Sequence, residues 1–400
     1  MPTSAWELDL PLLNTNGLDR LEALKVTREL ARDHWLVRSE MGFTVLRYED
    51  DLAVLRDPKF FSFLKAMNTS EFRSSDSNRG ESILSMEGPD HLRLRRLVAP
   101  AFSPAAAAPH RPMMREIFEE LLTPFLASGG GDFVSAVAEP YPIPIICRVL
   151  GAPREDWQLF SDWATDIFKI FNGNLAEDMP AIEKAGKEIG EYVGNLIEQR
   201  RHDLGDDLLS ALIVAEEEGD RLDHQEMVRL AEAVLLAGTD TTRNQLGCTM
   251  AVFAEYPDQW RLLQERPELA PKAVEESMRY LGAVRGTGRV ASEDITYRDV
   301  VFTKGTMVST NFAAGNRDQS VFAEPDEFNI AADREVQQLT FGSGVHRCLG
   351  AALARAELQE ALTLMAERID TVMLAGPVTW KPPTFGIWGP ASLPLSVTAR

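Results

Sequence analysis

The stretch FGSGVHRCLG, residues 341–350, places a single cysteine among glycines, directly after a histidine and an arginine. A cysteine acts chemically as its thiolate, which is both a nucleophile and a soft metal ligand. Three uses are therefore open for Cys348: a catalytic nucleophile, a metal ligand or a small buried side chain. The neighbouring residues and the rest of the chain have to decide between them.

The residues around Cys348 favour a metal ligand. His346 could serve a nucleophile as its base, but side chains two residues apart in an extended segment need not meet. Glycines allow a backbone to turn tightly and to lie against a flat, bulky group. From Ala351 the sequence AALARAELQEALTLMAERI predicts a long helix, whose positive N-terminal end stabilises a thiolate. A thiolate beside a planar group at a helix start is typical of an axial haem ligand.

Composition and charge limit the class of protein. The 400 residues are 44% hydrophobic and 26% charged, which is typical of a globular protein, and no shift in composition marks a domain boundary. We therefore expect a single domain over residues 1–400. A net charge of −20 argues against binding to nucleic acid or to anionic membranes. The chain starts without a secretory signal and has no apolar run that could span a bilayer, so a cytoplasmic protein is expected.

The spacing of apolar residues predicts a mainly helical fold with small β-sheets. Helices are expected at 111–127, 154–172, 178–202, 203–213, 224–256, 257–265 and 268–281. Strands are expected at 42–48, 294–311 and 392–399, with mostly loop over 315–346.

The longest predicted helix, 224–256, contains the run AGTDTTRN at 237–244. Glycine, aspartate and threonine are unfavourable in the middle of a helix, because they have poor helix propensity or compete for backbone hydrogen bonds. These residues therefore indicate a functional role for the run. The simpler alternative to such a role is a long core helix that tolerates a polar patch.

The segment GPDHLRLRRLVAPAFSP, residues 88–104, is predicted to be a helix closed by Pro100. His91 and Arg95 fall on one face of it, and Arg93 and Arg96 on another. A basic pair at this spacing in an acidic chain suggests an anionic partner for His91 and Arg95. Arg93 and Arg96 fit a solvated basic face.

The pattern F-x-x-G-x-x-x-C-x-G, met by Phe341, Gly344, Cys348 and Gly350, resembles the haem-binding signature of the cytochrome P-450 family. The resemblance covers essentially the whole chain and implies the cytochrome P-450 fold. It implies that the Cys348 thiolate is the axial ligand of a haem b iron, in a loop where Phe341, Gly342 and Gly350 contact the haem.

Two further segments carry the same resemblance. Glu276 and Arg279 in EESMR form an i, i+3 pair that is common on helices. In its order and distance before the cysteine it resembles the E-x-x-R pair of the family, which implies a structural role with Arg334 as a third partner. Gln338 departs from the family, which often has a histidine there. AGTDTT resembles the family's A-G-x-[D/E]-T-T, which implies that Asp240 and Thr241 supply protons during catalysis.

The resemblance also implies which residues hold the edge of the haem. His91, Arg95, Arg289 and His346 match contacts to the two propionates. His91 as an axial iron ligand is the competing interpretation.

By family position, the expected walls of the substrate pocket are Leu236, Ala237, Val284, Arg285, Ile387 and Trp388. Arg285 has two interpretations. It is either a surface arginine in a loop, as most arginines are exposed, or it receives a carboxylate, a phenolate or a carrier-bound acyl group.

The implied function is that of a haem-thiolate monooxygenase that hydroxylates or epoxidises a small hydrophobic molecule, with dioxygen and two electrons from a ferredoxin and its reductase. The reaction is expected to belong to natural-product biosynthesis or secondary metabolism, and the protein is expected to be a monomer. The basic residues Arg93, Arg96, Arg347 and Arg355 would receive an acidic ferredoxin. A phenol-coupling or peroxide-driven haem-thiolate enzyme is the alternative, and a non-catalytic haem sensor is a third hypothesis.

Overall fold

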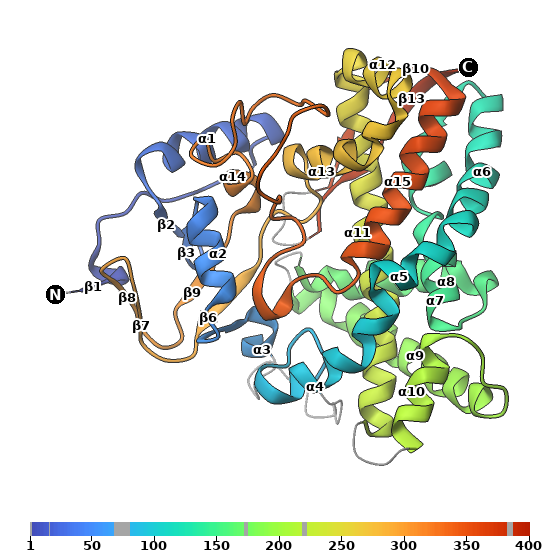
Figure 1. Ribbon diagram of the computed structural model, residues 1–400. Coiled ribbons are helices and arrows are strands. Elements are labelled where there is room, and N and C mark those ends of the chain that lie inside the picture. Colours follow the sequence, from blue (N-terminus) through green and yellow to red (C-terminus); the bar gives the residue numbers. More distant parts are fainter. Residues whose placement is uncertain (1, 16, 68–80, 172–174, 218–221, 382–386) are drawn as a thin grey trace. The chain divides into compact units, whose positions relative to one another are not determined.

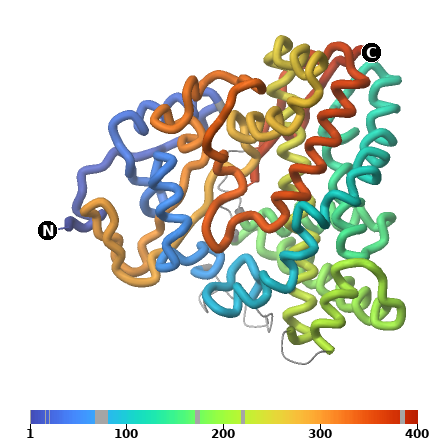
Figure 2. The backbone as a smooth tube through the Cα atoms, viewed as in Figure 1, coloured from blue at the N-terminus to red at the C-terminus, as the bar shows by residue number. Residues whose placement is uncertain are grey.

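The computed structural model describes residues 2–15, 17–67, 81–171, 175–217, 222–381 and 387–400 (Figures 1 and 2). The chain forms two compact units. The first comprises residues 1–92, 284–327 and 334–348, and the second comprises residues 93–283, 328–333 and 349–400. The single domain expected from the sequence stays a prediction.

The first unit holds two small sheets, with strand orders β2-β3-β9-β6-β4 and β1-β8-β7. Their strands are β1 (Thr3–Ser4), β2 (Leu36–Ser39), β3 (Gly42–Val45), β4 (Phe60–Ser62), β6 (Gly288–Ala291), β7 (Ile295–Tyr297), β8 (Val300–Phe302) and β9 (Met307–Ser309). The rings of Phe43 and Phe60 pack edge-to-face on Phe302, with centroids 6.1 and 6.0 Å away. In the five-stranded sheet Arg289 pairs with Ser62 on one side and Val308 on the other, so its backbone is held from both sides.

Short helices complete the first unit. They are η1 (Ala5–Glu7), α1 (Arg20–Asp33), α2 (Tyr48–Arg56), α3 (Phe63–Met67), α14 (Phe312–Gly315) and η8 (Gly344–His346). The helix α4 (Gly88–Val98) begins in the first unit and ends in the second.

The second unit is mainly helical. Its helices are η2 (Ala99–Phe102), α5 (Pro104–Ala107), η3 (Ala108–His110), α6 (Arg111–Ala127), η4 (Val134–Ala138), α7 (Pro142–Leu150), η5 (Arg154–Asp156), α8 (Trp157–Ile167), η6 (Phe168–Phe171), α9 (Leu175–Arg201), α10 (Leu208–Glu217), α11 (His224–Glu255), α12 (Pro257–Glu265), η7 (Pro267–Leu269), α13 (Ala270–Tyr280) and α15 (Ala351–Arg368). Two sheets, ordered β10-β13-β5 and β11-β12, belong to it. Their strands are β5 (Gly130–Asp132), β10 (Ile369–Leu374), β11 (Thr379–Trp380), β12 (Pro390–Ser392) and β13 (Pro394–Ala399).

The 32-residue helix α11 is the centre of the second unit. It begins at a capping box in which Asp223 and Glu226 each accept from the other's backbone N–H, which satisfies donors that the first turn leaves unpaired. The helices α7, α8, α9, α10, α12, α13 and α15 all pack on it (Figure 1). This packing, rather than local helix propensity, stabilises the polar run in its middle.

The prediction of a mainly helical fold with small sheets is confirmed. Two local predictions were wrong. The strand expected at 42–48 ends at Val45, because three acidic residues after Tyr48 favour a helix start and α2 begins there. The helix expected at 203–213 begins only at Leu208 and continues through acidic residues to Glu217. The helix that Pro100 was expected to close is present, since α4 ends at Val98 and η2 follows. In the described part of the chain, no helix has the length and the apolar character needed to cross a membrane.

Candidate active site

The loop that carries Cys348 is closed by its own backbone. The N–H of Cys348 donates to the carbonyl of Phe341 at 2.8 Å, and the N–H of Arg347 donates to the carbonyl of Gly344 at 3.1 Å. The Oγ of Ser343 accepts from Nε of Arg56 at 2.9 Å, which ties the loop to α2. Cys348 is exposed at the end of this turn. The loop therefore presents the thiol outward from a rigid backbone.

Glycines make the path of this loop possible. Gly342 and Gly344 have φ angles of 65° and 70°, in the left-handed region that L side chains rarely adopt. A Cβ on Gly344 would lie 2.1 Å from the carbonyl oxygen of Leu55, whereas nothing lies within 4 Å of a Cβ on Gly342 or Gly350. Gly344 thus packs on α2, and the other two glycines leave space that a bulky group can use.

Three of the four predicted propionate residues gather in the first unit. His91 on α4 is buried, and its ring centroid lies 4.5 Å from that of His346. Nε2 of His346 lies 3.0 Å from Oε1 of Glu87, which also accepts from the N–H of Ser62 at 2.5 Å. Burial would raise the pKa of Glu87, but the hydrogen bonds from His346 and Ser62 and the charges of His346 and Arg289 outweigh it and lower that pKa. Glu87 is therefore a carboxylate at the centre of a basic cluster.

The third of these residues, Arg289, is a buried cation on β6. Its guanidinium donates to the carbonyl of Gly288 at 2.9 Å and to Oγ1 of Thr287 at 3.2 Å. Burial lowers its pKa to about 10, although the charge of Glu87 opposes this shift. None of the carboxylates in the described residues forms an ion pair with it. A buried cation in this state favours an anionic ligand.

Arg95, the fourth predicted propionate residue, lies four residues after His91 on α4 and is half-buried. It belongs to the second unit. Arg93, on the other face of the helix, forms an ion pair with Glu226 at the start of α11.

The predicted proton residues lie where α11 becomes accessible. Between Leu230 and Phe253 every residue of the helix is buried except four: Leu236, Ala237, Gly238 and Thr241. Oγ1 of Thr241 donates to the carbonyl of Ala237 at 3.0 Å. A Cβ on Gly238 would lie 2.6 Å from Cγ1 of Ile146, so glycine is also what allows α7 to pack here. One short window of this core helix is therefore open beside Thr241.

Asp240 is buried directly next to this window and lies between two cations. Its carboxylate forms an ion pair with Arg243, one turn further along α11, and its Oδ1 lies 3.7 Å from Nζ of Lys381. Nη1 of Arg243 in turn lies 3.1 Å from Oε1 of Glu139. Sequence reasoning named Asp240 but missed these three partners, and it also missed Glu87. No local pattern in the sequence marks them.

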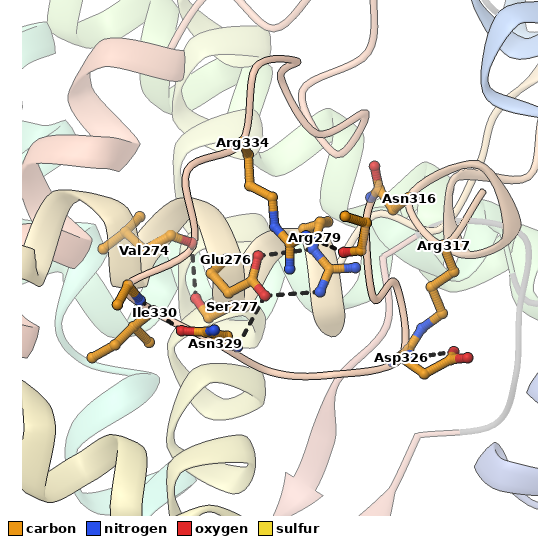
Figure 3. Close-up of polar contacts among 12 residues, drawn as sticks. Val274, Glu276, Ser277, Arg279, Asn316, Arg317, Asp326, Asn329, Ile330 and Arg334 are labelled. Atoms are coloured by element: carbon orange, nitrogen blue, oxygen red, sulfur yellow. Dashed lines mark hydrogen bonds and ion pairs between the residues drawn. The ribbon is translucent and has the colours of Figure 1, made fainter. Parts of the chain in front are cut away.

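Glu276 and Arg279 form a buried, two-pronged ion pair on α13, as Figure 3 shows. Nε and Nη2 of Arg279 each lie 2.8 Å from a carboxylate oxygen of Glu276, and Oε1 of Glu276 also accepts from the N–H of Asn329 at 3.1 Å. The pair therefore fixes the segment around Asn329 to α13. Arg334 belongs to the other unit, where it donates to the carbonyl of Ala323, and its role as a third partner stays a prediction.

The predicted pocket residues differ in exposure. In the second unit Ala237 is exposed, Leu236 and Ile387 are half-buried, and Trp388 is only 2% exposed. The ring of Trp388 stacks on Trp380 with centroids 4.5 Å apart. Its Nε1 donates to the carbonyl of Lys381 at 2.9 Å. Trp388 is therefore packed as a core residue.

In the first unit Val284 packs against the cluster of Leu55, Phe312 and Leu339. Arg285 is half-buried rather than fully exposed.

Comparison with known proteins identifies the family. The model of the cytochrome P-450 family matches residues 155–374. The chain is 38% identical to mycinamicin IV hydroxylase/epoxidase of Micromonospora griseorubida, over 98% of this chain and 99% of that protein. It is 35% identical to nocardicin C N-oxygenase of Nocardia uniformis subsp. tsuyamanensis, over 94% and 92% of the two chains. The crystal structure of CalO2 is similar with a TM-score of 0.89 and 30% identity, and covers 96% of this chain and 98% of that one.

The chain belongs to the cytochrome P-450 family, and it is a monooxygenase of that family. Membership implies a haem iron as cofactor, and dioxygen, a substrate and redox partners for turnover. The resemblance and the enzyme class predicted from the sequence are confirmed.

Proposed function

We propose that this cytochrome P-450 binds haem b through the thiolate of Cys348 and oxidises a small hydrophobic molecule. The observation that carries the proposal is the contrast between the cysteines. Cys147 and Cys248 are buried, and burial raises the pKa of the Cys147 thiol to about 12, so that thiol stays protonated. Cys348 is exposed at the end of the glycine loop, and a thiolate there is accessible to a metal.

The charges of the first unit fit the two propionates of a haem. Arg289 is a buried cation, and an anion beside it would compensate the cost of its burial. The rings of His91 and His346 are in contact, and Glu87 interacts with both His346 and Arg289. Arg95 lies on α4, four residues after His91. We assign these four residues to the propionates, and Phe341, Gly342 and Gly350 to the contact with the porphyrin.

When it is bound, a haem iron with a thiolate ligand activates dioxygen and inserts one oxygen atom into a substrate. The chain contributes positioning and protons. Cys348 would hold the iron. The hydroxyl of Thr241 donates to the carbonyl of Ala237 and keeps its lone pairs to accept a hydrogen bond. Asp240 is the acid that supplies Thr241. Leu236 and Ala237 give the open window of α11 apolar side chains, which suit a hydrophobic substrate.

The relatives support a substrate from natural-product biosynthesis and hydroxylation or epoxidation as the reaction, because their names include a hydroxylase/epoxidase, an N-oxygenase and "Cyclomarin C epoxidase CymV". Leu236, Ala237, Val284, Arg285, Ile387 and Trp388 are the proposed pocket residues. A ferredoxin and its reductase are the proposed electron donors. A monomeric, cytoplasmic protein stays a prediction.

The carbon-monoxide complex of the reduced protein tests this proposal. We expect the red-shifted Soret band that a thiolate ligand produces, and we expect Cys348→Ser to abolish it. The control is Cys248→Ala, which removes a buried thiol and should leave the band in place. A thiolate spectrum in Cys348→Ser, or none in the parent protein after reconstitution with haem, would contradict the proposal.

A further inference from the structure

Asp240 lies in a row of four alternating charges within the second unit. The order is Glu139, Arg243, Asp240 and Lys381, with 3.1 Å between the first two and 3.7 Å between the last two. Nη2 of Arg243 also donates to Oγ1 of Thr165 at 3.3 Å. The side chain of Asp240 is only 5% exposed, so protons can reach its carboxylate only through its neighbours.

The two cations beside Asp240 differ in what they can do. Arg243 stays charged at any physiological pH and has no proton to give. Lys381, directly after β11, has an ammonium that can lose a proton. Its side chain is 30% exposed, so it meets solvent at one side and Oδ1 of Asp240 at the other. Among the described residues, Lys381 is the one lysine that forms an ion pair with Asp240.

Burial and the neighbouring charges together shift the pKa of Lys381. Burial lowers its pKa from 10.5, Asp240 raises it, Arg243 adds to the lowering and Glu139 opposes it. The net result is a lower pKa than that of a solvated lysine. An ammonium with a lowered pKa gives up its proton more readily near neutral pH, which is what a proton donor requires.

We propose that Lys381 delivers protons from solvent to Asp240, and so acts on the reaction only through Asp240. An N–H bond of the Lys381 ammonium breaks and an O–H bond forms on Oδ1 of Asp240, directly or through one water. The electron pair stays on Nζ, which takes a new proton from solvent. Asp240 then supplies Thr241. The inference rests on the proposed function, in which Asp240 is the acid of the site.

The first test needs neither haem nor substrate, so its failure is distinguishable from failure of the proposed function. The lysines of the full chain are labelled by reductive ¹³C-methylation and titrated by NMR. We expect Lys381 to titrate below 10.5, the ordinary lysine value, because burial lowers its pKa. Lys187, which lies 3.8 Å from Glu191 but is 75% exposed, is the comparison residue for the turnover test below. Because Asp240 stabilises the ammonium, Asp240→Asn should lower the pKa of Lys381 further. A Lys381 that titrates at or above 10.5 and does not respond to Asp240→Asn overturns the inference.

The second test measures turnover. Lys381→Met removes the ammonium, and Lys381→Arg keeps the charge but cannot release a proton. Both variants should form roughly 10- to 100-fold less product per electron consumed, with more hydrogen peroxide released and a larger solvent deuterium isotope effect. The control is Lys187→Met, which should behave as the parent protein.

The arginine variant separates proton delivery from charge alone. If Lys381→Arg restores product formation to the parent level, the residue supplies only positive charge and the inference fails. It also fails if Lys381→Met leaves the yield and the isotope effect unchanged. Thermal unfolding of each variant checks that the fold is retained.

Discussion

Gly344 is the residue on which the path of the cysteine loop depends most. It combines a left-handed φ of 70° with backbone contact, since a Cβ there would overlap the carbonyl of Leu55. Gly342 has nearly the same φ, 65°, but open space around it. The two glycines therefore separate the cost of the backbone conformation from the cost of the packing.

We expect Gly344→Ala to be much more destabilising than Gly342→Ala. A left-handed L residue costs about 1–2 kcal/mol, which is the whole effect expected for Gly342→Ala. Gly344→Ala must also displace α2 or the loop, so a loss of at least about 3 kcal/mol is expected. Denaturant unfolding measures both. Equal losses in the two variants would show that contact with Leu55 does not constrain the loop.

Residue patterns predicted some of the site and missed the rest. Cys348, Asp240 and Thr241 stand in motifs whose residue types and spacing are visible in the chain. Glu87 and Lys381 stand in no motif. They matter because Glu87 contacts His346 and Lys381 contacts Asp240, each far away in the sequence.

A buried acid on α15 accepts a hydrogen bond from α11. Glu357 on α15 is completely buried, and the hydroxyl of Thr242 on α11 hydrogen-bonds to it. Burial raises its pKa well above 4.5, and the bond from Thr242 only partly opposes this. The folded chain therefore keeps a proton on Glu357 that the unfolded chain releases above about pH 4.5.

This difference predicts the pH dependence of a variant. The pKa of Glu357 is higher in the folded than in the unfolded chain. Its contribution to the free energy of unfolding is therefore full below the unfolded pKa of 4.5 and is lost as the pH rises toward the folded pKa. Glu357→Gln removes the loss. Its unfolding free energy relative to the parent should rise between about pH 5 and about pH 8, by on the order of 1 kcal/mol per pH unit at most.

Denaturant unfolding at the two pH values measures this relative change. Glu367→Gln, at a half-exposed position of the same helix, is the control and should follow the parent chain. A Glu357→Gln variant that keeps a constant offset from the parent at both pH values would contradict the raised pKa.

Helices with strong apolar periodicity were predicted closely. The bounds of α6 and α12 are those predicted, and α11 ends one residue before its predicted end. The helices α1 and α2 were not predicted. The capping box of Asp19 and Glu22 was the available signal for α1. The apolar pattern before Tyr48 favoured a strand that continued through the start of α2.

For the molecule as a whole, a net charge of −20 opposes the approach of an acidic electron donor. Local basic residues then decide where such a donor can bind. Two of the four predicted arginines are in ion pairs, Arg93 with Glu226 and Arg355 with Glu275. Arg96 is exposed on α4 and is therefore a better candidate for contact with the donor than these two paired arginines.

We expect Arg96→Glu to slow association with a reduced acidic ferredoxin by roughly tenfold at low salt, and the difference to shrink at high salt because ions screen the charge. Stopped-flow reduction measures the rate. Arg261→Glu changes the net charge equally at an exposed position of α12 and is the control. If the two variants are slowed equally, only the total charge matters and Arg96 is not part of the contact.

The sequence by itself was enough to predict the family, the enzyme class and the central helix, because these depend on residue types at short, regular spacing. Only the tertiary structure decided which charges meet: Lys381 and Arg243 beside Asp240, and Glu87 beside His346. It also decided which part of α11 stays open. The physical reason is that burial and ion pairing depend on how distant elements pack, and local patterns carry no information about that packing.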